Sequence, residues 1–339
     1  MKKTLSYLII FGFLLSIVVA YTAYTKLFSK AVFQKETIYI TKTDKYLDLK
    51  AKLDDKNLIK DEKVFDLLAK KMNLENNVHA GKFILSEGSS IIDIIRKLRG
   101  NQQDAVNLVI NNVNFKQDLA GKISNQLNID SLTFLNFLNN ESKLKEKGYN
   151  KDNIMCQFVP NTYEMYWSPS LGKLIKRFEK EHNTFWNEQR TNLAKKKGLS
   201  TDEAFILASI VEKEYKFASE RKRIAGVYLN RLNIGMPLQA DPTCKFAWGD
   251  LSLKRVLNIH TQNPHSYNTY YIKGLPPGPI CLPETSTIDD VLNAESHNYI
   301  YFCAHADLDG KHEFNKTLSA HNAAARKYQA ALNKLKIYK

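Results

Sequence analysis

Residues 199–215 read LSTDEAFILASIVEKEY, and this stretch decides how the larger part of the chain folds. Ser200 followed by Glu203 is a capping box, a pairing of side chains with backbone N–H groups that begins a helix. At 100° per residue, Leu207 and Val211 fall on one apolar face together with other aliphatic residues. The stretch therefore predicts an amphipathic helix that packs one face against a core.

Two glutamates near the end of this helix have different surroundings. Glu214 lies at the edge of the apolar face, whereas Glu212 lies roughly 160° away on the polar side with Ser209. A carboxylate beside an apolar face loses hydration, so its pKa rises and it can hold a proton near neutral pH, as a general acid must. The alternative for Glu214 is a surface residue paired with a cation of the next helix. For Glu212 we adopt that structural interpretation.

The chain after this helix changes in character. A second helix is expected with Ser219 as its cap, Val227 and Tyr228 on its inner face and Gly235 just beyond its end. Polar or proline-rich loops follow, rich in amides, hydroxyls and aromatic rings. Such loops suit a sugar, whose hydroxyls need hydrogen-bond partners and whose ring faces pack on aromatic side chains. They comprise residues 239–243, 266–270 and 274–279.

Residues 36–103, well before this helix, predict a small α+β module. The order is strand, helix, helix, strand, helix, and Ser89 or Ser90 caps a final helix that stops at Gly100. The module has about the size of a carbohydrate-binding LysM domain. The predicted elements are strands at 37–41 and 79–85 and helices at 47–58, 64–72 and from 91 onward.

Two further segments complete the predicted organisation. Residues 104–150 form a small α/β connecting unit, with a strand at 106–110 and helices at 115–127 and 131–138, and its role cannot be read from the sequence. The lysine-rich run 143–151 is the best linker candidate. Residues 151–339 are expected to form a larger mixed α+β catalytic domain, so the fold class is α+β.

The N-terminus predicts a membrane anchor over residues 1–27. A charge-free apolar run from Thr4 to Thr25 is just long enough to cross ~30 Å of hydrocarbon as a helix. A signal peptide cleaved after Ala20 is the alternative, but its apolar core is longer than the usual 7 to 15 residues. The lysines on both sides of the run leave the orientation open.

Charge and cysteine content restrict the classes of function. The formal net charge of +14 is spread along the chain and favours contact with anionic surfaces. A nucleic-acid partner is not expected, because no basic stripe or aromatic RNA-binding motif accompanies the charge. The cysteines form no CxxC pair, and no histidine has a second ligand at metal spacing, so no metal and no cofactor are expected. The cysteines are Cys156, Cys244, Cys281 and Cys303.

Motifs spread over about 120 residues resemble the endolytic murein transglycosylases, the YceG-like (MltG) family. Their order and spacing match the family, whereas Asn161, Ala240 and Cys281 depart from its usual pattern and leave nearby substrate contacts in doubt. The anchor and the LysM-like module are similar to the family's architecture, though less specifically. The matching motifs are 207–214, 218–221, 227–232, 234–239, 241–243, 267–270, 274–280, 312–315 and 321–322.

The resemblance implies a lyase that cuts the MurNAc–GlcNAc bond of nascent peptidoglycan strands and leaves 1,6-anhydro-MurNAc ends. The family's catalytic glutamate falls on Glu214, the residue that the helical projection also favours. Glycan contacts are expected from polar residues of this region, although Gln239, Asp241, Asn268 and Tyr270 could instead fix their own loops by hydrogen bonding. The expected glycan-binding residues are Gln239, Asp241, Thr243, Asn268, Tyr270 and Asn315.

The resemblance also implies a single-pass protein of the cell inner membrane with its bulk in the periplasm. Peptidoglycan synthases are the expected neighbours, beside which such enzymes end growing strands. Three alternatives remain: a non-catalytic peptidoglycan-binding scaffold of the cell-wall synthesis machinery, a hydrolase that uses the same site, and a membrane-tethered nucleic-acid binder suggested by net charge alone.

Overall fold

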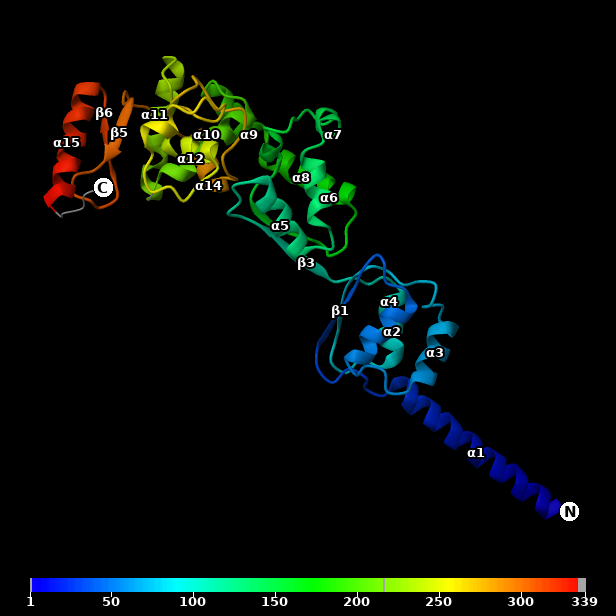
Figure 1. Cartoon of the computed structure of the whole chain (residues 1–339). Coiled ribbons are helices and arrows are strands. Elements are labelled where there is room, and N and C mark those ends of the chain that lie inside the picture. Colours follow the sequence, from blue (N-terminus) through cyan, green and yellow to red (C-terminus); the bar gives the residue numbers. More distant parts are fainter. Residues whose placement is uncertain (1, 216, 335–339) are drawn as a thin grey trace. The chain divides into compact units, whose positions relative to one another are not determined.

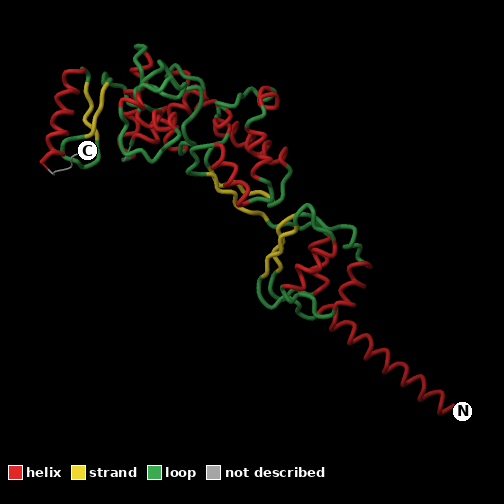
Figure 2. Tube along the Cα trace, viewed as in Figure 1, coloured by secondary structure: helices red, strands yellow, loops and turns green. Residues whose placement is uncertain are grey.

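The computed structural model describes residues 2–215 and 217–334, and its internal contacts divide the chain into two compact units (Figure 1). The first unit takes the residues up to Leu108 with Asn125–Ile129 and Tyr163–Ser170. The second takes Val109–Ser124, Asp130–Thr162 and the residues from Leu171 onward. Both units mix helices and short strands (Figure 2), which confirms the predicted α+β class.

Helix α1 (Lys2–Phe28) opens the first unit and is apolar along most of its length. Its stretch Ile9–Phe28 has a mean hydropathy of 1.6, and none of its side chains is fully buried, although Leu27 at its end is partly covered. Apolar side chains that no protein core covers need an apolar solvent such as lipid. The predicted N-terminal apolar helix is confirmed, with a length and composition that suit a signal anchor or a signal sequence.

The module that follows α1 has the predicted order of elements. Strands β1 (Glu36–Ile40) and β2 (Gly81–Leu85) pair antiparallel. Helices α2 (Tyr46–Asp55), α3 (Glu62–Lys71) and α4 (Ile91–Arg99) supply the rest of an aliphatic core with fully buried Leu49, Leu53, Phe65 and Ile95. Ser90 caps α4 in a capping box with Asp93, which confirms one of the two predicted caps.

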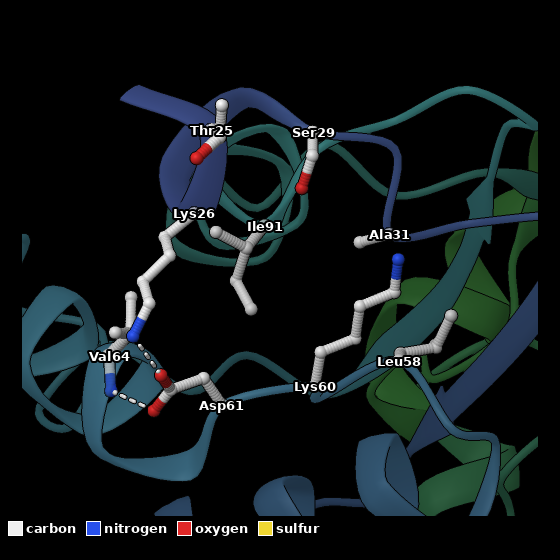
Figure 3. Close-up of a pocket in the computed structure, with 9 residues that line it drawn as sticks. All are labelled: Thr25, Lys26, Ser29, Ala31, Leu58, Lys60, Asp61, Val64 and Ile91. Carbon is white, nitrogen blue, oxygen red and sulfur yellow. Dashed lines mark hydrogen bonds and ion pairs between the residues drawn. The ribbon is translucent and has the colours of Figure 1, made fainter. Parts of the chain in front are cut away.

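Helix α1 is fastened to this module at its C-terminal end. Leu27 packs against the module core, and Lys26 Nζ lies 2.8 Å from Asp61 Oδ2. The backbone N–H groups of Ala31 and Val32 both donate to the carbonyl of Ser89. A pocket of about 420 Å³ lies at this junction, and Figure 3 shows Ile91 at its apolar floor. Its lining residues are Thr25, Lys26, Ser29, Ala31, Leu58, Lys60, Asp61, Val64 and Ile91.

Strands β3 (Ala105–Ile110) and β4 (Asn161–Tyr166) form a two-stranded sheet. The chain between these two strands forms four helices: α5 (Lys116–Gln126), α6 (Ser131–Leu138), α7 (Glu141–Lys145) and the 3-10 helix η1 (Ile154–Gln157). Residues 143–151, the lysine-rich run expected as a linker, are packed rather than extended. Helix α7 includes the start of this run, and the side chain of Leu144 is fully buried.

Helix α10 (Thr201–Glu214) is the central element of the second unit. It contacts α9 (Glu188–Lys196), α11 (Arg221–Asn233), α12 (Asp241–Trp248) and α14 (Thr285–Leu292). Every residue from Ala204 to Val211 is buried, so the predicted polar side is wrong for Ser209. Its hydroxyl donates to Ile206 O (2.7 Å) and accepts from Ile280 N (3.0 Å), because the proline-rich segment covers that side of the helix.

The predicted capping of the helix after α10 is also wrong. A 3-10 turn, η2 (Ala218–Glu220), contains Ser219, and α11 begins at Arg221 without a side-chain cap. The expected inner-face residues Val227 and Tyr228 are buried, and Gly235 follows the helix with φ of 66°. The remaining helices of this part are α8 (Leu171–Phe185) and the short α13 (Asn258–Thr261).

A β-hairpin and a helix end the described chain. Strands β5 (Tyr301–Ala304) and β6 (His312–Asn315) pair antiparallel, with Tyr301 opposite Asn315. Helix α15 (Leu318–Lys334) packs on both strands, and β5 also contacts α11. This hairpin, drawn in orange in Figure 1, forms one wall of the candidate site.

Candidate functional site

Glu214 is the last residue of α10, and its side chain enters a pocket of about 440 Å³. Tyr215 leaves the helix in an extended conformation with φ of −90° and ψ of 147°. The C-terminal end of a helix carries partial negative charge, so an ionised carboxylate is unfavourable there. The pocket lining is Glu214, Arg231, Leu238, Gln239, Asp241, Tyr270, Tyr301, Phe302, Cys303, Ala304, His312, Leu318, His321 and Asn322.

A buried phenol holds the carboxylate of Glu214. The hydroxyl of Tyr228, on α11, donates a hydrogen bond of 2.8 Å to Glu214 Oε1, and its side chain is only 1% exposed. The edge of the Phe302 ring packs against Tyr228 with centroids 5.8 Å apart. Tyr228 therefore fixes the position of one carboxylate oxygen of Glu214, a residue that also lines the pocket.

Burial raises the pKa of Glu214 to about 7. The hydrogen bond from Tyr228 opposes this rise because it favours the ionised form, whereas the negative charge of Asp241 adds to it. The cations Lys245 and Arg231 lower the pKa by smaller amounts. A carboxyl group with this pKa exists in both protonation states near neutral pH, so it can give up a proton and take one back.

Arg231 brings a buried cation to the pocket wall. Its side chain is 7% exposed and donates to the carbonyl oxygens of Ile300 (2.7 Å) and Leu238 (2.6 Å). These bonds tie α11 to β5 and to the loop before α12. Arg231 thus holds two pocket walls together and places a positive charge near Glu214.

Three of the predicted glycan-binding residues reach the pocket. The hydroxyl of Tyr270 donates to Asp241 Oδ1 at 2.5 Å, and this pair joins a loop to the first turn of α12. Gln239 has a positive φ of 50°, and its backbone N–H donates to Thr269 O (3.0 Å). This unusual conformation is held by the loop and leaves the Gln239 side chain exposed on the pocket wall.

The other three predicted glycan-binding residues do not line the pocket in the described part of the chain. Thr243 is fully buried and its hydroxyl lies 2.8 Å from that of Thr269. Asn268 is also fully buried, and its amide donates to the carbonyl groups of His260 and Thr261 in α13 and of Asn263 just after it. Asn315 is 9% exposed at the end of β6. Asn268 therefore corresponds to the loop-fixing alternative stated from the sequence, and the hydroxyl of Thr243 bonds the neighbouring segments in the same way.

A buried pair that the sequence analysis did not single out positions the hairpin. Glu220, 7% exposed, accepts at Oε1 from the backbone N–H of His312 (3.0 Å), and its Oε2 lies 3.0 Å from His312 Nδ1. The pair attaches β6 to the turn before α11. Both residues lie in the matching motifs, yet their 92-residue separation hid the contact. Helix α15 contributes His321, which stacks on Tyr301 at 5.3 Å.

Glu212, and two of the histidines for which no metal site was expected, form hydrogen bonds within the protein. Glu212 accepts hydrogen bonds from the hydroxyl of Thr287 and from Glu284 N (3.3 Å) and so holds the start of α14. His260 Nδ1 accepts from Leu257 N (2.9 Å), and His297 Nδ1 accepts from Tyr299 N (3.2 Å). The partners of Glu212 are thus a backbone N–H and a hydroxyl of α14 rather than the cation that was expected, and each histidine ring accepts from a backbone N–H two or three residues away.

Comparison with known proteins places these features in a family. The model of the YceG-like family matches residues 38–327. An endolytic murein transglycosylase of Bacillus subtilis (strain 168) is 30% identical over 294 residues, 82% of this chain and 80% of that protein. One from Streptococcus pneumoniae serotype 2 (strain D39 / NCTC 7466) is 34% identical over 153 residues, 43% of this chain and 27% of that protein. A 2.6 Å crystal structure of a yceG-like protein from Listeria monocytogenes covers 86% of this chain and 99% of its own, with 27% identity and a TM-score of 0.54.

Proposed function

The chain belongs to the YceG-like family, and we propose that it is an endolytic murein transglycosylase, a lyase that cuts peptidoglycan strands. The observation that carries the proposal is Glu214, a carboxyl group with a pKa of about 7 in a polar pocket. The named activity of the Bacillus and Streptococcus relatives supports the choice of substrate.

Glu214 serves as both acid and base in the proposed reaction. Its protonated form donates to the oxygen that links MurNAc to GlcNAc, and the bond from that oxygen to the muramyl C1 breaks as positive charge develops on C1. The carboxylate then takes the proton of the muramyl C6 hydroxyl, whose oxygen bonds to C1 and closes a 1,6-anhydro ring. Glu214 ends the cycle protonated, so no second catalytic carboxylate is required.

The tethered hydroxyl explains why one carboxylate suffices. Glycosidases that use water or a covalent intermediate need a second carboxyl group. A hydroxyl on the same sugar has a high effective concentration at C1 and replaces it. Tyr228 keeps the pKa of Glu214 from rising further, so protonated Glu214 remains acidic enough to give up its proton in the first step. Gln239, Asp241 and Tyr270 line the pocket and are the side chains that we assign to glycan binding.

We assign α1 to a single membrane crossing, with the catalytic region on the outer face of the cytoplasmic membrane. The packing of Leu27 and the ion pair of Lys26 with Asp61 favour a retained anchor, because they join the helix to the module. We further propose that the module of residues 36–103 docks on glycan in the manner of a LysM domain. In this arrangement the enzyme acts on strands that are still close to the membrane and ends their elongation beside peptidoglycan synthases.

The test is a digest of purified sacculi followed by mass spectrometry of the soluble products. The native chain should release fragments with 1,6-anhydro-MurNAc ends, and Glu214→Gln should abolish them while the protein remains folded. Glu212→Gln is the matched control on the same helix and should retain activity. Release of anhydro ends by Glu214→Gln at the native rate would refute the assignment. Reducing ends in place of anhydro ends would indicate a hydrolase, and no release by the native chain would indicate a scaffold.

A further inference from the structure

The imidazole of His312 belongs to the glycan pocket but has no part in the proposed reaction. His312 opens strand β6, and its side chain is 15% exposed. Two neighbours fix the ring: Phe302 packs almost at right angles to it, with centroids 5.2 Å apart, and Glu220 Oε2 lies 3.0 Å from Nδ1. A ring held in this way keeps one orientation and can present a fixed group to a ligand.

The hairpin has attachments that do not involve the imidazole ring. The backbone N–H of His312 donates to Glu220 Oε1 (3.0 Å), and every residue of β6 is paired with β5. The guanidinium of Arg231 separately ties the start of β5 to α11 through the carbonyl of Ile300 (2.7 Å). The bond between the carboxylate and the imidazole therefore acts chiefly on the ring itself.

This bond determines which ring nitrogen carries the proton. An ionised carboxylate can only accept hydrogen bonds, so Nδ1 of His312 is the donor to Glu220. In the neutral imidazole, Nε2 then has no proton and is an acceptor. Within residues 2–215 and 217–334, Nε2 has no hydrogen-bond partner, and it is not among the unpartnered atoms that are buried, so it keeps accessible surface.

His312 lies near the group that reacts. The Phe302 ring contacts both His312 and Tyr228, with centroid distances of 5.2 and 5.8 Å, and Tyr228 bonds to Glu214. Glu214 and His312 line the same pocket of about 440 Å³. One glycan strand that enters this pocket can therefore contact both residues.

We propose that His312 is a glycan-binding residue and that Glu220 is its positioning residue. Nε2 of His312 accepts a hydrogen bond from an O–H or N–H group of the bound strand. MurNAc and GlcNAc both carry hydroxyl and acetamido groups, which supply such donors. The identity of the ligand rests on the proposed function, since the glycan is the strand that Glu214 cuts.

Binding measured without turnover tests the contact. The full chain with Glu214→Gln, in detergent, is titrated with murein fragments of one glycan length, and calorimetry gives Kd. His312→Asn is the test variant, because its amide nitrogen can still donate to Glu220 from the place of Nδ1, whereas no atom takes the place of Nε2. The matched control is His305→Asn, in the turn of the same hairpin and outside the pocket lining in the described part of the chain. There the amide oxygen can accept from Asp307 N as Nδ1 does.

Glu220→Gln tests the positioning role. The amide oxygen can still accept from the backbone N–H of His312, whereas the amide nitrogen donates to Nδ1 and so moves the ring proton to Nε2. Nε2 is then a donor and can no longer accept. Nitrogen NMR of the folded Glu214→Gln chain, labelled at histidine, reads the tautomer directly. The proton should be on Nδ1 with Glu220 and on Nε2 with Gln.

His312→Asn and Glu220→Gln should each weaken binding by roughly three- to tenfold, the loss expected for one hydrogen bond, and His305→Asn should leave Kd unchanged. In the chain that retains Glu214, His312→Asn should raise KM more than it lowers kcat, because the contact already forms in the bound state before reaction.

Three results would overturn the proposal while the glycan assignment stands. They are native affinity in His312→Asn or Glu220→Gln, a loss in His305→Asn as large as that in His312→Asn, and a ring proton on Nε2 when Glu220 is present. A Glu214→Gln chain that binds no fragment would overturn the proposed function as well.

Discussion

Tyr228 and Glu214, on two different helices, are joined by a 2.8 Å hydrogen bond from the phenol to Oε1. The carboxyl group of Glu214 has a pKa raised to about 7, which suits acid catalysis near neutral pH. Its partner, the side chain of Tyr228, is almost fully buried. Burial and this hydrogen bond act on the pKa in opposite directions. The balance between them sets the pH range in which the proposed reaction can run.

Removing the phenol should move the activity profile to higher pH. Tyr228→Phe eliminates a hydrogen bond that favours the ionised carboxylate, so the pKa of Glu214 rises. A bond of about 1 kcal/mol corresponds to about 0.7 of a pH unit. The alkaline limb of the pH–rate profile, measured by release of anhydro ends, should shift upward by roughly that amount. An unchanged limb would show that Glu214 is not the group that titrates.

A substitution at Asp241 should move the same limb in the opposite direction. The charge of Asp241 raises the pKa of Glu214, so Asp241→Asn lowers that pKa, and activity falls at a lower pH than in the native chain. The amide oxygen can still accept the hydrogen bond from Tyr270, which keeps the loop in place. Shifts of the same sign in Tyr228→Phe and Asp241→Asn would contradict this account of the site.

Glu214→Gln should stabilise the protein at alkaline pH. Because the folded-state pKa of Glu214 is raised to about 7, its contribution to stability is fully present below its ordinary pKa and is lost as pH rises through about 7. The neutral amide avoids that loss, so the variant should exceed the native chain by about 1–3 kcal/mol at pH 8 and by much less at pH 4.5. Urea unfolding at both pH values measures the difference, and an equal gain at both would argue against a raised pKa.

Gly278, in the proline-rich segment, should not tolerate a side chain. A Cβ atom there would lie 2.0 Å from the carbonyl oxygen of Asp152 and 2.6 Å from the hydroxyl of Tyr267. Gly278→Ala must displace backbone and should lower the free energy of unfolding by about 2–3 kcal/mol. Gly172→Ala on α8, where nothing lies within 4 Å, is the control and should be neutral or stabilising. Equal stabilities of the two variants in urea would disprove the close contact.

Local patterns predicted much of the secondary structure because they depend on neighbours in the chain. The capping box at Ser200 was recognisable because it involves residues three positions apart, and the cap of α4 was narrowed to Ser89 or Ser90. Ser219 had the same appearance but lies within a 3-10 turn, where contacts of Glu220 with the distant β6 hold the backbone. Local capping preference is worth about 1 kcal/mol and yields to such tertiary contacts.

The sequence by itself determined the helix that carries Glu214, the residue's place beside an apolar face, and the family to which the chain belongs. Only the tertiary structure decided its surroundings: Tyr228 and Arg231 come from the next helix, and His312, from a strand almost a hundred residues further along, lines the same pocket. It also decided that Thr243 and Asn268 are buried in hydrogen bonds to neighbouring segments while Gln239 and Asp241 line the pocket. The reason is physical: a helix follows from short-range sterics and hydrogen bonds, whereas a pocket forms where distant segments meet and exclude water from the groups between them.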